Sequence, residues 1–475
     1  MLSHTIRGAV RGLAAALALT PGSLSAQGSD TLRLSLADAV TRVLRTSDEA
    51  RLADAQLEVA DAQVTIARAV GLPQLRLNGN SQQVLKNARA EIVGQVFNQP
   101  YVYSSNLNVQ QALFQGGRIV AAAQAASRVE QAAELTREET RAQLAVDIQR
   151  VYLNAVFTAR IADIQTTNLA LADDRLGQVE QLERAGRASR YEVLRARVER
   201  ANLEPLLRQA ENDRTLAELE LRRLLNIPAN RPIALVTSLD AAQVRTLAAA
   251  VPARDPGVRA AVQAAELTAS ARRAGIRVAR ADLLPTINAG FSFGYLALPT
   301  SPAFPSRLGA RANEFCVGDT TGTRLCQNNG WFPDRSFNIV MSWPLFDGLR
   351  AKGQVDLAQA QARVADLQAL QAKEDASIDI ERARAELARA LAVASARETT
   401  VREAEEAFEL ASLRLARGVG TQLEVSDAQF ALLTARSTDA RAVFDLYLAV
   451  AELARVRAEP IPLPDGTTVS TRLTR

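Results

Sequence analysis

The sequence is short of the side chains on which most enzyme chemistry depends. Its 475 residues include one histidine, His4, and two cysteines, Cys316 and Cys326. Because His4 lies in a segment that we interpret below as a cleaved export signal, the mature chain is expected to contain no histidine. This excludes histidine-based general acid–base catalysis, histidine-activated nucleophiles and histidine-ligated metal sites. We therefore expect no enzyme, no cofactor and no metal site.

Aromatic residues and an excess of either charge are also scarce. Phe, Trp and Tyr make up 4% of the chain, which is little for a core built on large rings. The 56 basic residues are nearly balanced by 52 acidic ones, so no nucleic-acid partner is expected. What the chain has instead is 48% hydrophobic residues, many of them alanine. That composition is typical of closely packed helices with narrow interfaces.

Residues 1–25 have the pattern of an export signal. Arg7 and Arg11 make a positive start, an apolar run from Leu13 to Leu19 follows, and small residues then provide a cleavage site. The alternative, an N-terminal membrane anchor, would need roughly 18 apolar residues. No cysteine follows the run, so no lipid anchor is expected there. No later run is long enough to cross a bilayer as a helix, which leaves a soluble exported protein or a membrane β-barrel.

Two long stretches lack the residues that end helices. Residues 118–183 contain no proline and only one glycine, Gly177, and residues 354–417 contain neither. Apolar residues recur in both at helical spacing. A helix of about 65 residues would be about 100 Å long, so it must pack side by side with other helices. Helical periodicity alone does not exclude an ordinary coiled coil.

Four shorter segments alternate between apolar and polar residues: 74–83, 101–110, 286–295 and 336–345. Such alternation gives a strand one apolar face and one polar face. The polar residues are mainly Asn, Ser, Thr and Gly, and most aromatic residues of the chain lie in or near these segments. This is typical of membrane barrel strands with lipid on one side and a wet lumen on the other. A half-buried sheet of a soluble domain is the alternative.

The two halves of the chain repeat one another. Leu72-Pro73 matches Leu284-Pro285, and Leu113-Phe114 matches Leu345-Phe346. A later match relates residues 186–193 to residues 418–425. We therefore predict an organisation into duplicated units. Its parts are a signal peptide (1–25), a first repeat (30–226, hairpin 72–115), an equatorial linker (227–256), a second repeat (257–458, hairpin 284–347) and a tail (459–475).

At these motifs the chain resembles the TolC-like outer membrane efflux family (outer membrane factors). The resemblance rests on the duplicated order of the Leu-Pro and Leu-Phe-x-Gly motifs and on the turn from Gly418 to Asp427-Ala428-Gln429. It implies a mainly α fold with a membrane β-barrel portion. Long antiparallel helices would form a trimeric α-barrel tunnel, and each protomer would give four strands to a shared 12-stranded β-barrel. Four strands are too few to close a barrel alone, so the sequence itself also predicts oligomerisation.

The resemblance also implies a function. It predicts a homotrimer in the bacterial outer membrane, with helices extending into the periplasm. Its partners would be outer membrane lipid, a periplasmic adaptor (membrane fusion) protein and an inner-membrane pump. We expect a passive export duct of a tripartite efflux or type I secretion system, gated at its periplasmic helix tips. The alternative is a secreted or periplasmic coiled-coil scaffold with a small soluble sheet.

Two acidic residues after the second tip turn are the candidate gate. In the family that the chain resembles, acids at the positions of Glu424 and Asp427 form rings that narrow the periplasmic entrance. Three copies of each would attract cations. The alternative is a solvated helix start, where acids are favoured by the helix dipole. The first repeat has Glu192 and Arg195 at the matching positions, so an acidic ring is expected in one repeat only.

The residues of the tip turns are the candidate adaptor contacts. They are Arg184, Gly186, Arg417, Gly418 and Gly420. The glycines also fit a simpler role, because a helix C-cap needs a residue that tolerates a positive φ.

The two cysteines lie ten residues apart in the long loop of the second hairpin. In an exported protein such a pair favours a Cys316–Cys326 disulfide over a metal site or a reactive thiol.

Overall fold

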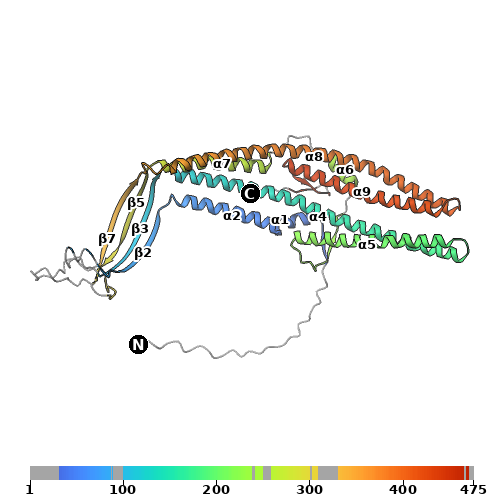
Figure 1. Ribbon diagram of the computed structural model, residues 1–475, viewed down its shortest axis with the longest axis horizontal. Helices are drawn as coiled ribbons and strands as arrows, with labels where there is room; N and C mark the ends of the chain where they lie inside the picture. Colours follow the sequence, from blue (N-terminus) through green and yellow to red (C-terminus); the bar gives the residue numbers. More distant parts are fainter. Residues whose placement is uncertain are drawn as a thin grey trace, which may run out of the picture.

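The molecule is elongated, with a sheet at one end and helices that extend from it to the other (Figure 1). The computed structural model describes residues 31–86, 88, 92, 100–237, 241–249, 258–299, 302–308, 330–464 and 467–469. The predicted export signal and the predicted disulfide between Cys316 and Cys326 lie outside these residues, so both stay predictions.

Two helices of 67 residues each, α4 (Arg118–Arg184) and α8 (Arg350–Ala416), run from the sheet to the far tip. There each is followed by an antiparallel helix of 35 residues, α5 (Arg190–Leu224) after α4 and α9 (Gln422–Val456) after α8. The long helices expected from the proline-free stretches are therefore confirmed. Among the described residues, no helix has both the length and the apolarity to cross a membrane.

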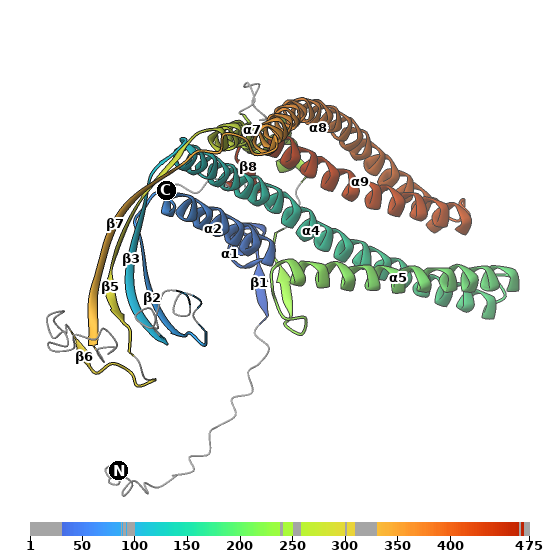
Figure 2. The ribbon, with the colours of Figure 1, turned by 60° about the vertical axis from the view of Figure 1, so that its left-hand side comes forward.

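Two shorter helices lie beside the halves of α4 and α8 that are nearer the sheet (Figure 2). α2 (Asp48–Ala69) packs against α4, and α7 (Ala260–Arg280) packs against both α4 and α8. Alanine dominates these contacts, because its small side chain lets helices approach closely and it favours the helix itself. Apart from Leu387, the buried residues of α8 are Ala351, Ala362, Ala365, Ala383, Ala390, Ala394 and Ala411.

The sheet has the strand order β2-β3-β5-β7-β6, and its four long strands are antiparallel neighbours. The short β6 (Arg307–Leu308) pairs in parallel with the start of β7. The long strands are β2 (Gln74–Gln83), β3 (Tyr101–Gln115), β5 (Thr286–Ala297) and β7 (Gly330–Ser342).

The strand predicted over 336–345 is observed several residues closer to the N-terminus. β7 begins at Gly330 and ends at Ser342, so Trp343 and Leu345 are not part of it. Pro344 has no N–H to donate to a neighbouring strand, which explains why pairing stops before it. The other three predicted strands are confirmed, although β3 continues five residues further, to Gln115.

The register gives the sheet one apolar and one polar face, as predicted. Phe291 lies opposite Val109 on one side and Phe337 on the other. Ser292, the next residue, lies between Asn108 and Ser336. These alternating rows run through all four long strands. Arg335 is an exception on the apolar face, where its guanidinium lies 5.0 Å from the ring centroid of Phe293.

The main core lies midway along the helices. There β1 (Leu32–Leu34) pairs in parallel with β4 (Ile233–Leu235), and α1 (Leu36–Thr46) packs on α4. The remaining elements are α6 (Ala241–Ala249), η2 (Ala281–Leu283), β8 (Ile461–Pro462) and β9 (Thr468–Val469).

Two fully buried tyrosines connect this core. The Tyr152 hydroxyl donates to the carbonyl of Leu34 at 2.7 Å and accepts from the N–H of Thr237 at 3.2 Å. The Tyr447 hydroxyl lies 2.8 Å from the carbonyl of Pro462 and 3.0 Å from Oε1 of Gln149 in α4. Tyr152 thereby ties α4 to β1, and Tyr447 ties α9 to α4 and to β8. The predicted domain boundaries stay predictions.

Candidate functional site

Both tip turns reverse the chain through a glycine in the left-handed conformation. Gly186 has φ of 71° and Gly418 has φ of 76°. The Gly186 N–H donates to the Glu183 carbonyl at 2.8 Å, and the Gly418 N–H donates to the Leu415 carbonyl at 2.9 Å. A Cβ at either glycine would meet no atom within 4 Å. Glycine is therefore required here by the backbone angle and not by lack of space.

The second turn is the tighter of the two. A Cβ at Gly420 would lie 2.9 Å from the Cβ of Arg414 and 3.0 Å from the backbone nitrogen of Leu415. The Gly420 N–H also donates to the Arg414 carbonyl at 3.1 Å. The first turn has Ala188 at the matching position, and its N–H donates to the equivalent carbonyl, that of Leu182, at 3.3 Å. Both turns therefore fold back over the end of their long helix, and only the second has a glycine at the point of closest approach.

The matching acids of the two turns have different partners. In the first turn, Glu192 accepts from the N–H of Ser189 at 2.6 Å, and Ser189 caps α5 in return. This hydrogen bond and a second one from the Ser189 hydroxyl lower the pKa of Glu192. In the second turn, the Glu424 carboxylate lies 3.3 Å from Nε of Arg414 instead. Glu424 therefore contacts the end of α8, whereas Glu192 serves as a helix cap.

Asp427, one turn further along α9, faces the first repeat. It attracts Arg175 of α4, and Glu199 of α5 attracts the same guanidinium more strongly. Burial lowers the pKa of Arg175, the attraction to Glu199 opposes this, and repulsion from Arg195 adds to it. Asp427 and Arg175 thus attract one another from the two helical hairpins, although the attraction is weaker than that between Arg175 and Glu199.

A groove lies at this contact, between the α4–α5 hairpin and α9. Polar and charged side chains from all three helices line it, among them Arg175, Ser189, Arg195, Glu199 and Ser426. Further from the tip the same groove is lined by apolar residues, including Leu206, Phe430 and Leu433. The lining of the groove therefore changes from charged to apolar residues along the boundary between the two hairpins. This end of the molecule is the best candidate for a conformational change.

The structure puts the predicted site residues in two groups. Glu424 and Asp427 lie in the first two turns of α9, both exposed. Arg184 is the last residue of α4 and Arg417 is the C-cap of α8, and both are exposed beside their turns. The sequence did not reveal Arg175 as a partner of Asp427, because it lies in the middle of a regular helix with no motif around it.

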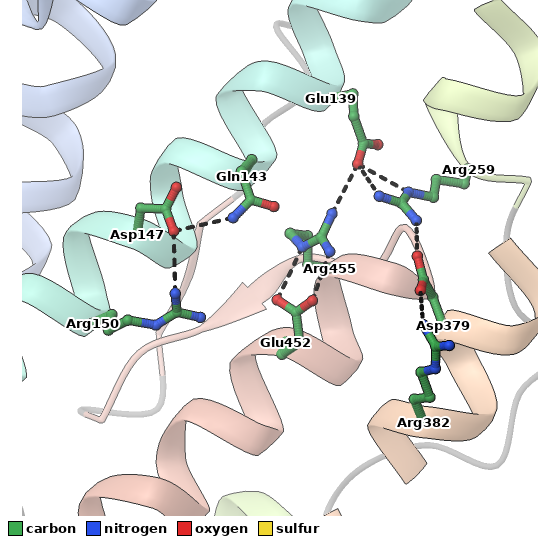
Figure 3. Close-up of polar contacts among 9 residues, drawn as sticks. All are labelled: Glu139, Gln143, Asp147, Arg150, Arg259, Asp379, Arg382, Glu452 and Arg455. Atoms are coloured by element: carbon green, nitrogen blue, oxygen red, sulfur yellow. Dashed lines mark hydrogen bonds and ion pairs between the residues drawn. The ribbon is translucent and has the colours of Figure 1, made fainter. Parts of the chain in front are cut away.

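A second charged cluster, not predicted, lies nearer the sheet (Figure 3). Oε1 of Glu139 in α4 accepts from Arg455 at 2.9 Å and from Arg259, just before α7, at 2.7 Å. Arg259 also donates to Asp379 of α8 at 2.8 Å, and Arg455 donates to Glu452 at 2.6 Å. Burial lowers the pKa of Arg259, but its hydrogen bonds to Glu139 and Asp379 raise it overall.

This equatorial cluster connects α4, α8, α9 and the start of α7: Glu139 joins Arg455 to Arg259, and Arg259 in turn joins Asp379. The side chains of Arg455, Arg259 and Glu139 are only 7%, 16% and 19% exposed. Buried charges of this kind are held in place by their mutual pairing. Within the described ranges, no three His, Cys, Asp or Glu side chains converge to hold a metal ion.

Comparison with known proteins identifies similar sequences. The chain matches the family described as "Outer membrane efflux protein" over residues 40–226 and 258–458. It is also 25% identical over 408 residues to "Pyoverdine export outer membrane protein OpmQ" of Pseudomonas putida. That match covers 83% of this chain and 79% of the relative.

Solved structures share the fold. The outer membrane protein VceC of Vibrio cholerae aligns with a TM-score of 0.69 and 21% identity, over 89% of this chain and 95% of that one. The CmeC outer membrane channel of Campylobacter jejuni aligns with a TM-score of 0.71 and 14% identity, over 89% of this chain and 85% of that one. The predicted fold class, long antiparallel helices with a four-stranded portion, is confirmed.

Proposed function

The chain belongs to the outer membrane efflux protein family, and from this premise we propose that it is the trimeric channel of a tripartite efflux or type I secretion system. As a family member it is a protein of the bacterial outer membrane whose helices extend into the periplasm. The family consists of channels and not of enzymes, which disfavours the alternative of a coiled-coil scaffold. In this proposal the protein is a passive duct without covalent chemistry.

The open sheet is the observation that carries the proposal. All ten residues of β2 are exposed, and so are residues 333–342 of β7 at the opposite edge. Unpaired edges of this length invite another strand. Closure of three such sheets into one barrel would pair every edge and enclose the polar face.

Channel activity of assembled trimers is the test of this proposal. We expect trimers in outer-membrane fractions that resist dissociation in detergent until heated, and single-channel currents when they are added to planar bilayers. The coiled-coil scaffold alternative predicts a soluble monomer that purifies without detergent and carries no current.

The proposed gate is the contact between the two helical hairpins at the tip. Asp427 attracts Arg175 across this contact, and Glu424 pairs with Arg414 within the second hairpin. Splaying of the hairpins would separate Asp427 from Arg175, so the resting protomer favours the closed tip. The adaptor would act at the adjacent turns, where Arg184, Gly186, Arg417, Gly418 and Gly420 lie beside the groove.

Removing both acids of the gate tests the ring hypothesis. The double variant Glu424→Ala with Asp427→Ala takes six negative charges from a trimer. One charge pair is worth about 1 kcal/mol at 4 Å in water and less at a greater distance, so the six charges together should supply at least about 1.4 kcal/mol. Block of the channel by divalent cations should therefore weaken roughly tenfold or more. The measurement is single-channel current against added Mg²⁺ or Ca²⁺. Glu403→Ala with Glu406→Ala, two exposed acids of α8, is the matched control and should leave the block unchanged. An unaltered block in the gate variant would mean that the cation site lies elsewhere.

A further inference from the structure

The two repeats pair their strands in the same register. Two differences in residue number relate the repeats. The β2 shift is the difference between Leu72 and its match Leu284, and the longer β3 shift is the difference between Leu113 and its match Leu345. Applied to β2 and β3, the two shifts carry the pair Gln74–Gln110 onto Thr286–Ser342, which is an observed pair of β5 and β7. The same holds for all ten pairs of β2 with β3. The two hairpins therefore have the same strand register at every one of these pairs.

One strand contact has no counterpart inside the chain. β3 and β5 join the first repeat to the second. The equivalent contact would join β7 to β2, but β2 lies at one edge of the sheet and β7, beyond its short pairing with β6 at Gly330 and Trp331, forms the other edge. The contact can therefore form only between β7 of one copy and β2 of the next.

We propose that the next copy of the chain docks on β7 in the register that the internal repeat dictates. This rests on the trimer of the proposed function and adds the residues that meet. The β3 shift carries Asn108 onto Val340 of β7. Asn108 pairs with Ser292, which the β2 shift in reverse carries onto Asn80 of the next copy's β2. Val340 should therefore pair with Asn80. Applying the two shifts to neighbouring pairs of β3 and β5 predicts two further pairs, Ser342 with Asn78 and Asn338 with Gln82.

The faces of the sheet agree with this register. Asn80 and Gln82 belong to the polar rows of β2, and they meet residues of the polar rows of β7. Gly79, on the other face, meets Met341 of the apolar rows. The sheet would therefore continue across the boundary between copies with its polar and apolar faces unbroken.

The helices show the same relation in their burial. Leu52 and Val59, one heptad apart on α2, are 60% and 59% exposed. The β2 shift carries them onto Ala264 and Ala271 of α7, which are only 8% and 5% exposed. α7 packs against both α4 and α8, whereas α2 packs against α4. The exposed apolar side of α2 thus lies where an equivalent of the α4–α7 contact would cover it.

The surface that would cover it lies on α8. Val364 is 54% exposed. The β3 shift in reverse carries it onto Ala132 of α4, which is only 6% exposed. In this arrangement α8 of one copy and α2 of the next would run antiparallel, as α4 and α7 do within the chain. Strands and helices therefore indicate one interface between copies.

Paired cysteines test the register in the assembled protein. In a chain with Cys316→Ser and Cys326→Ser, oxidation should link Asn80→Cys with Val340→Cys, or Gly79→Cys with Met341→Cys, into covalent dimers and trimers. Neighbouring pairs of an antiparallel ladder alternate in spacing, so these two cover both kinds of pair. In the controls, Asn80→Cys is combined with Asn338→Cys or Ser342→Cys. A displacement by two positions moves a partner by about 6.7 Å along the strand, which gives a diagonal Cα separation of about 8 Å, beyond the range that a disulfide spans.

Preferential linking of a displaced control, or no linking of either predicted pair in a protein that native mass spectrometry shows to be a trimer, would refute the register and leave the channel standing. A monomer without current would instead refute the proposed function and the interface together.

The helical side of the interface has its own matched pair. Val364→Lys should reduce trimer about tenfold or more, because it would bury an unpaired charge. Val120→Lys is the control: Val120 is 62% exposed, and its equivalent in the second repeat is already an exposed lysine, Lys352. Equal loss of trimer in both variants would contradict the helical contact.

Discussion

Replacing Gly294 with alanine is expected to prevent assembly of the sheet and with it the heat-resistant trimer. A Cβ at Gly294 would lie 2.8 Å from Cα of Asn106 and would also overlap the carbonyl oxygen of Ser105 and the Asn106 side chain. Two of these atoms belong to the backbone of β3, so the clash is relieved only by moving β3 away from β5. Overpacking of this kind costs about 2 kcal/mol, or roughly a thirtyfold change in a folding equilibrium.

Gly79→Ala is the matched control for this variant. Gly79 lies within β2, and a Cβ there would meet no atom of its own copy within 4 Å. Its equivalent in the second repeat is Phe291, which pairs with Val109, so the corresponding contact between copies should accept a side chain at position 79. Both substitutions add one methyl group to a strand glycine, so they differ in the space around it. Semi-native electrophoresis of outer-membrane fractions, heated and unheated, measures the trimer. Equal amounts of trimer from both variants would show that close approach of β3 and β5 is not what glycine provides at position 294.

Replacing Glu139 with leucine is expected to lower the free energy of unfolding by about 3 kcal/mol. Breaking a buried ion pair leaves a charge without its partner in a medium that solvates it poorly. Here one carboxylate serves two guanidinium groups, those of Arg259 and Arg455, and these side chains belong to segments that meet only in the folded protein. The midpoint of denaturant-induced loss of helical circular dichroism measures the effect.

Arg382→Leu provides the comparison for this second variant. Arg382 lies 3.8 Å from Asp379 at the edge of the same cluster, but its side chain is 77% exposed. An exposed ion pair contributes about 0.5 kcal/mol or less, so the midpoint should hardly move. If both variants lowered the midpoint equally, burial would not be the reason that the cluster stabilises the equator.

The secondary structure could be predicted from the sequence to within a few residues, with one clear exception. α4 and α8 follow from stretches without proline, and β5 follows from its alternation. The predicted ends of β7 were wrong, because the alternation of apolar and polar residues continues past Pro344, which cannot donate a hydrogen bond to a neighbouring strand. β1 and β8 of the equatorial core are three and two residues long and carry no periodic signal.

The tip illustrates what sequence reasoning leaves open. The turn motif located Glu424 and Asp427, because a glycine turn followed by a helix start is a local pattern. It could not supply their partners. Arg414 approaches Glu424 only because the second turn brings the start of α9 back to the end of α8. Arg175 lies near enough to attract Asp427 only because two hairpins from different repeats pack side by side.

The sequence by itself determined the long helices, the two-faced strands and the duplication, since each depends on spacing between neighbours along the chain or on repetition of such spacing. It also determined the scarcity of histidine and the balance of charge. Only the tertiary structure decided which distant residues meet: β3 with β5, Glu139 with Arg259 and Arg455, and Asp427 with Arg175. Such contacts depend on how whole helices and strands pack, and no local sequence pattern predicts them.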